Sequence, residues 1–99
     1  MGKRSKNKGY RAERELTLRL RKEGLNAVRV PLSGAVEGFE GDLLLEGKKI
    51  EVKARHDGFK ELYKWIEGKD LLALKADRRD FLMVMRLDDF VKLMKGVKV

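Results

Sequence analysis

The 99-residue sequence has no cysteine, a single proline and no long hydrophobic run. Without cysteine, the chain holds no disulfide framework, no thiolate metal site and no cysteine nucleophile. Its longest apolar run, Phe81 to Met85, is five residues, whereas a membrane-spanning helix needs ~18 or more. No apolar stretch follows Met1, so we expect no secretory signal. We therefore expect a soluble protein of the cytoplasm, or of the host cell if a virus encodes it, with no membrane partner.

Acidic residues are in the minority, with 16 Asp and Glu against 24 Lys and Arg, which gives a formal charge of +8. Residues 1–29 hold ten basic and three acidic residues, a net +7, while residues 30–99 hold fourteen and thirteen, a net +1. Such a basic segment favours a polyanionic partner, nucleic acid first and an anionic membrane surface second. A solubilising basic tail is the alternative. Because a chain of this length supports one core, we expect a flexible basic arm at residues 1–9 and a single domain over residues 10–99.

Hydrophobic periodicity predicts an α+β (or α/β) domain. Ala12, Leu16 and Leu20 recur at helical spacing and Gly24 stands where that helix would end. The remaining patterns predict three strands, a helix, two strands and a final helix capped by Asp88; these lie at residues 27–31, 41–45, 49–55, 59–66, 71–75, 81–87 and 88–94. We expect a central mixed sheet of about five strands flanked by helices.

Three further side chains have expected positions in or outside the core. Met83 and Met85 alternate on a predicted strand, so we expect them in the core. Trp65 lies off the apolar stripe of its helix and would pack in a dimer interface, stack on DNA or form a second core layer.

The strongest chemical pattern lies on the two middle strands. Glu51 and Lys53 are two residues apart and so share one face of their strand. If Glu46-Gly47 forms a two-residue hairpin turn, Asp42 lies opposite Glu51 with Cβ atoms about 4.5–5.5 Å apart. Two carboxylates that close suit a hard divalent cation, Mg²⁺ with Mn²⁺ as a substitute. Such an ion activates water for phosphodiester hydrolysis, and Lys53 would stabilise the developing charge. The alternative is the solvated face of an edge strand.

The arrangement of Asp42 and Glu51-Val52-Lys53 on a predicted hairpin resembles the PD-(D/E)xK nuclease superfamily. Four ordered blocks narrow the resemblance to the archaeal-type Holliday junction resolvases over residues 8–55. These blocks are Gly9 to Leu16, Val28 to Gly34, Gly41 to Leu44 and Ile50 to Lys53. The resemblance implies a restriction-endonuclease-like nuclease fold, metal-dependent cleavage of four-way DNA junctions and a homodimer.

By position, the resemblance assigns roles to individual residues. Glu13 is implied to complete the metal site with Asp42 and Glu51, although a glutamate in the first turn is also favoured by the helix dipole alone. Ser33 is implied to lie in a loop near the scissile phosphate, and Arg14 and Arg29 to serve substrate binding and catalysis. The full set of expected DNA-binding residues is Lys3, Arg4, Lys6, Lys8, Arg11, Arg14, Arg29 and Arg55.

Two features depart from the family pattern. Gly41 replaces the proline before the first aspartate, and the interval between Asp42 and Glu51 is short. His56 follows the active strand but stands beside Asp57-Gly58, which favours a turn residue over a general base. Two other functions compete with junction resolution: a related nuclease that cuts other branched, nicked or linear DNA, and a non-catalytic DNA-binding module. A membrane-surface role is weaker, because the first helix has only a narrow apolar stripe.

Overall fold

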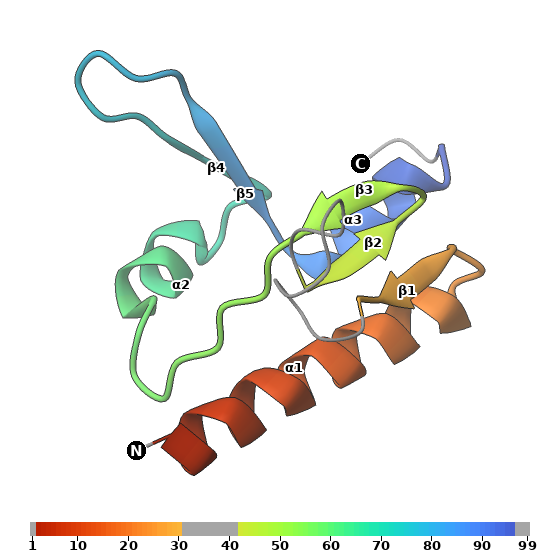
Figure 1. Cartoon of the computed structure of the whole chain (residues 1–99). Coiled ribbons are helices and arrows are strands. Elements are labelled where there is room, and N and C mark those ends of the chain that lie inside the picture. Colours follow the sequence, from red (N-terminus) through yellow and green to blue (C-terminus); the bar gives the residue numbers. More distant parts are fainter. Residues whose placement is uncertain (1, 31–41, 97–99) are drawn as a thin grey trace. The chain divides into compact units, whose positions relative to one another are not determined.

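The computed structural model describes residues 2–30 and 42–96, with side chains from Gly9 onward (Figure 1). It contains three helices and five strands in the order α1, β1, β2, β3, α2, β4, β5, α3. The chain divides into two compact units, Met1–His56 and Asp57–Val99. The first unit contains α1 and the first three strands. The predicted single domain over residues 10–99 stays a prediction.

Helix α1 spans Gly2–Lys22 and ends as the sequence predicts. Gly24 adopts a φ of 83°, its N–H donates to Arg21 O, and the N–H of Leu25 donates to Leu20 O. This pair of bonds is the Schellman motif, which needs a left-handed residue at the helix end. The helix begins earlier than predicted, so the backbone of the segment expected to form an irregular arm is helical from Gly2. Lys and Arg have good helix propensity, which lets the basic segment extend the helix.

The first unit has a three-stranded antiparallel sheet in the order β1-β2-β3. Strand β1 is Ala27–Arg29, β2 is Leu43–Leu45 and β3 is Lys48–Ile50. Leu45 pairs with Lys48, as the two-residue turn predicts. The turn residues Glu46 and Gly47 both have positive φ angles, 49° and 79°, which is the geometry of a type I′ hairpin turn. The predicted hairpin register is confirmed through the Leu43–Ile50 pair.

The ladder changes at Asp42, one residue beyond that pair. The N–H of Asp42 donates to Ile50 O at 2.8 Å, a bond displaced by one residue from the regular register, as in a β-bulge. Strand β3 stops at Ile50, so residues 51–55 are not part of the strand predicted there. The expected direct pairing of Asp42 with Glu51 is therefore absent from the ladder. A bulge redirects the side chain it carries, and this redirection decides where the Asp42 carboxylate points.

The core of the first unit joins one face of α1 to the sheet. Leu20 on the helix and Leu43 and Leu45 on β2 are almost completely buried, and burial of each such side chain contributes roughly 1.5–3 kcal/mol. Thr17 is also buried, at 1% exposure, because its Oγ1 donates to Glu13 O at 2.7 Å. The predicted helical stripe thus packs against the sheet, and Glu13 lies at its edge.

The second unit contains α2 (Lys60–Ile66), β4 (Leu71–Leu74), β5 (Leu82–Met85) and α3 (Leu87–Met94). Strands β4 and β5 form a two-stranded antiparallel sheet. Arg86 links three of these elements, since its guanidinium donates to Ile66 O at 2.9 Å and to Lys69 O at 2.7 Å. These carbonyls lie at and just beyond the end of α2, where helix carbonyls lack intrahelical partners.

Several expectations for the sheet and the second unit need correction. In the described residues the five strands form sheets of three and two with antiparallel pairing throughout, whereas one mixed sheet was expected; the short β3 and the self-paired β4–β5 hairpin account for the difference. Met83, at 60% exposure, lies outside the core, contrary to the expectation, and Tyr63 is 72% exposed, because a two-stranded sheet and a two-turn helix cover few side chains. Asp88 lies inside the first turn of α3 after the N-cap Arg86, where its charge suits the helix dipole. Trp65 is 51% exposed, as its position off the stripe predicts.

Within the described residues, no helix combines the length and the apolar character needed to cross a membrane.

Candidate functional site

Glu13 projects from α1 toward the end of β1. Its Oε1 lies 3.5 Å from Nη2 of Arg29, and its side chain is 17% exposed. The position of Glu13 at the edge of the buried stripe of α1 predicts this orientation. Its partner, Arg29, is also a residue of the predicted site. The structure therefore brings Glu13 and Arg29 together, from segments that are 16 residues apart in the chain.

Arg29 is held on a second side by an aromatic ring. Its guanidinium carbon lies 4.2 Å from the ring centroid of Tyr10, which is within the range of a cation–π contact. The Nε atom of Arg29 is buried and has no hydrogen-bond partner among the described atoms. Hydrogen bonding to Arg29, followed by its positive charge, lowers the pKa of Tyr10. Hydrogen bonding to Tyr10 likewise raises the pKa of Arg29, against the effect of burial.

Asp42 is the most buried of those predicted site residues whose side chains the structure describes, at 8% exposure. Its Oδ2 accepts the backbone N–H of Val52 at 2.6 Å. A charge-assisted bond of this length is among the stronger hydrogen bonds in proteins. The bulge thus directs the Asp42 carboxylate along the hairpin to the residue between Glu51 and Lys53. Sequence reasoning placed Asp42 near this motif but missed the backbone bond, because the bulge that produces it has no signature in the sequence.

Glu51 and Lys53 lie on the same side of their extended segment, as the alternation predicts. Their Oε1 and Nζ atoms are 3.4 Å apart, with side-chain exposures of 54% and 59%. An ion pair this exposed contributes little to stability. Both groups therefore remain accessible to a ligand at little energetic cost.

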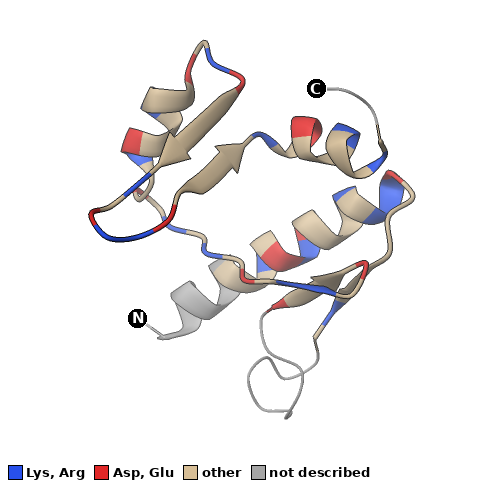
Figure 2. Cartoon of the chain, turned by 90° about the horizontal axis from the view of Figure 1, so that it is seen from above, with Lys and Arg blue, Asp and Glu red and all other residues tan. Residues whose placement is uncertain are grey.

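Apart from Arg29, which contacts Glu13 and Tyr10, the expected DNA-binding residues fall into two groups. Arg11, Arg14 and Arg55 have exposed side chains, as phosphate contacts require. The four basic residues of the expected arm are Lys3, Arg4, Lys6 and Lys8. Their backbone lies in the first turns of α1. Figure 2 shows acidic as well as basic positions along the described part of α1. The predicted Ser33 lies outside the described residues.

The three predicted metal ligands have separate partners: Arg29 for Glu13, the Val52 N–H for Asp42, and Lys53 for Glu51. Across residues 2–30 and 42–96, no three acidic or histidine side chains gather closely enough to hold a metal ion. His56 is exposed in a bend, in agreement with its predicted turn position.

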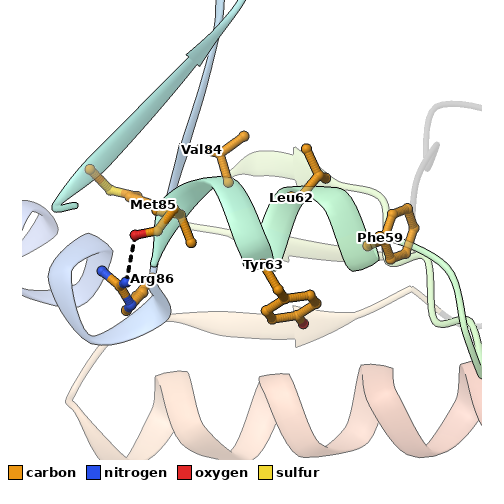
Figure 3. A pocket seen from close by; sticks show the side chains of 7 residues that line it. Phe59, Leu62, Tyr63, Val84, Met85 and Arg86 are labelled. Carbon is orange, nitrogen blue, oxygen red and sulfur yellow. Dashed lines mark hydrogen bonds between the residues drawn. The ribbon is translucent and has the colours of Figure 1, made fainter. Parts of the chain in front are cut away.

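An apolar cavity of about 500 Å³ lies in the second unit. Figure 3 shows it between α2 and the end of β5, with Arg86 at one side; its lining residues are Phe59, Leu62, Tyr63, Ile66, Val84, Met85 and Arg86. Arg86 is the one charged residue of the lining, and its guanidinium already binds the carbonyls of Ile66 and Lys69. The cavity therefore suits apolar packing rather than acid–base chemistry.

The contact between Tyr10 and Arg29 predicts a pH dependence. Replacement of Arg29 by Ala should raise the pKa of Tyr10, because it removes the hydrogen bond and the positive charge that lower this pKa most, and leaves only the smaller lowering effect of Arg14 against the raising effects of desolvation and Glu13. The chain has two tyrosines, so titration of tyrosinate absorbance in a Tyr63→Phe background reports Tyr10 alone. A lowered native pKa means that this contact adds stability as pH rises through that pKa and loses it as pH falls. An unchanged pKa in Arg29→Ala would contradict this contact.

A comparison with protein-family models matches residues 4–98 to the family described as archaeal Holliday junction resolvase (Hjc). Searches of curated proteins and of solved structures each found no match. The family match extends beyond residues 8–55, where the sequence resemblance lies, and includes the second unit. It confirms that resemblance over nearly the whole chain. The chain therefore belongs to the archaeal Holliday junction resolvase (Hjc) family.

Proposed function

We propose that this protein is a metal-dependent endonuclease that resolves four-way DNA junctions by paired phosphodiester hydrolysis. Membership of the Hjc family implies resolvase activity. The observation that supports the catalytic assignment is the bond from Val52 N–H to Asp42, which attaches one acidic residue of the motif to the segment that carries Glu51 and Lys53. A restriction-endonuclease-like arrangement of the complete chain is part of this proposal.

The acidic residues suit a hard divalent cation. Asp42 is held as a carboxylate acceptor by a backbone N–H, and Glu51 is half-exposed beside an equally exposed lysine. Mg²⁺ prefers oxygen ligands, binds through one or two carboxylates and retains several waters. Asp42 and Glu51 would hold the ion, with Glu13 as the third carboxylate. When bound, the ion would polarise the scissile phosphate and supply a water of lowered pKa.

The remaining residues act on the substrate directly. Lys53, at 59% side-chain exposure, is free to leave Glu51 and stabilise negative charge on the phosphate. Arg29 and Arg14 would bind phosphate oxygens, and Ser33 would lie near the scissile group. The basic positions of α1 and Arg55 would hold the DNA backbone, with recognition resting on the shape of the branch rather than on bases.

We also propose a homodimer, because resolution requires paired cuts in opposing strands and a two-fold dimer supplies two identical sites. Exposed apolar residues of the second unit support this assembly. Tyr63 and Trp65 on α2 and Leu82 on β5 are 72%, 51% and 67% exposed, and aromatic residues are enriched in interfaces. Sedimentation equilibrium should give twice the chain mass at micromolar concentration, and Tyr63→Glu should shift the protein toward monomer. A wild-type monomer in the presence of a junction would exclude paired cutting by a dimer.

The decisive experiment compares a four-way junction with a linear duplex of the same sequences. With Mg²⁺ we expect cleavage of the junction at symmetric positions, little cleavage of the duplex, and none of either after chelation of divalent ions. Mn²⁺ should replace Mg²⁺. Equal cleavage of both substrates would favour the broader nuclease, and binding without cleavage under all metal conditions would favour a DNA-binding module.

Substitution of the carboxylates separates binding from catalysis. Asp42→Asn and Glu51→Gln should lower junction cleavage at least about a hundred-fold while junction affinity measured without divalent ions changes little. Asn is preferred to Ala at position 42, because Ala would leave the Val52 N–H without its acceptor and destabilise the hairpin. Glu13→Gln should also impair cleavage.

Glu15→Gln is the matched control, since Glu15 lies on the same helix with an exposed side chain. Its cleavage rate should equal that of the wild type. Full activity in Asp42→Asn or Glu51→Gln would remove these residues from the catalytic site.

A further inference from the structure

We propose that Tyr10 is a positioning residue that holds the Arg29 guanidinium in place for a DNA phosphate. This inference rests on the proposed function, in which Arg29 binds substrate, and adds a residue that the catalytic motif does not contain. The proposal rests on the contact in which the guanidinium carbon of Arg29 lies 4.2 Å from the ring centroid of Tyr10.

The contact with Glu13 does not fix Arg29 by itself. The Nη2–Oε1 distance is 3.5 Å, at the long end of the range for a hydrogen bond. The two side chains are 29% and 17% exposed, so solvent screens their attraction in part. An arginine side chain has several rotatable bonds and loses considerable rotamer freedom when it is fixed. A second contact is therefore needed to define one position of the guanidinium.

The ring of Tyr10 supplies that contact. Tyr10 and Glu13 are three residues apart on α1, so their side chains project from neighbouring positions of one helix face. The ring lies against the guanidinium face, while Glu13 contacts its edge through Nη2.

Tyr10 contributes more to the position of Arg29 than to the core. Its side chain remains 55% exposed, so little of its apolar surface is buried. Arg29 itself keeps 29% of its side-chain surface exposed, and a guanidinium has five N–H donors. Donors beyond the one that faces Glu13 therefore remain for a phosphate.

The ring also holds Arg29 in a way that does not depend on the charge of Glu13. If Glu13 shared its carboxylate with a cation, its attraction for Arg29 would fall, whereas the attraction between guanidinium and ring would persist. Tyr10 would thus keep Arg29 close to the site when Glu13 binds a cation.

Two variants of similar apolar size test the role of the ring. Tyr10→Leu removes the π face, and we expect about a ten-fold loss of kcat/KM on a four-way junction. Tyr10→Phe keeps the ring face and removes only the hydroxyl that hydrogen-bonds Arg29, so it should stay within about three-fold of the wild type. Both variants should fold, and Tyr10→Leu should unfold at a slightly lower temperature than Tyr10→Phe because it loses the ring contact. Equal losses in the two variants would overturn a role of the ring face, and failure of Tyr10→Leu to fold would assign the ring to the core instead.

A double-mutant cycle shows whether Tyr10 acts through Arg29. In an Arg29→Ala background, Tyr10→Leu should change kcat/KM by less than about two-fold, because the group it positions is already absent. A loss as large as in the wild-type background would overturn the proposal. Leu18→Ala is the control, since Leu18 lies on α1 with a similar exposure of 50%, and its effects should be the same in both backgrounds.

The same cycle on thermal unfolding separates this inference from the proposed function. If the wild type cleaves no junction under any metal condition, the nuclease assignment fails, but the unfolding cycle still measures coupling between Tyr10 and Arg29. Additive effects on unfolding together with normal wild-type cleavage would overturn the positioning role alone.

Discussion

The hydrogen bond from the Val52 N–H to the Asp42 carboxylate organises the candidate site. It joins the residue before β2 to the segment after β3 and draws a nearly buried charge to the position between Glu51 and Lys53. Two backbone features make this bond possible. The type I′ turn at Glu46-Gly47 sets the register of the hairpin, and the displaced bond from Asp42 N–H to Ile50 O turns the Asp42 side chain along the strand.

Arg29 has a comparable role at the end of the neighbouring strand β1. Strand β1 ends at this residue, and the side chain reaches α1 through Glu13 and Tyr10. A charge with part of its surface buried is stable only with compensating partners, and here the partners are a carboxylate and a ring rather than a full set of hydrogen bonds. Among the described residues, the buried Nε of Arg29 has no hydrogen-bond partner. Such incomplete satisfaction is common where a side chain must bind a ligand.

The second unit differs from the first in how it is stabilised. An isolated two-stranded sheet is marginal in water, and the β4–β5 hairpin gains support from Arg86, which ties the start of α3 to the end of α2. Several of its large apolar side chains remain exposed. An apolar surface of this kind is costly to leave in water, and this cost supports the proposed homodimer.

The order of the elements, the hairpin register and the family could be predicted from the sequence, because they depend on local signals: helical spacing on α1, Gly24 at the helix end, and a two-residue turn before β3. The position of Glu13 at the edge of the buried stripe was also predictable. The bond from the Val52 N–H to Asp42, the position of Arg29 between Glu13 and Tyr10, and the exposure of Tyr63 and Met83 instead depend on tertiary contacts. These features arise from a bulge, from contacts between segments distant in the chain and from the separation of the strands into two sheets. None of them leaves a periodic pattern in the sequence, because they depend on which surfaces meet after the elements have formed.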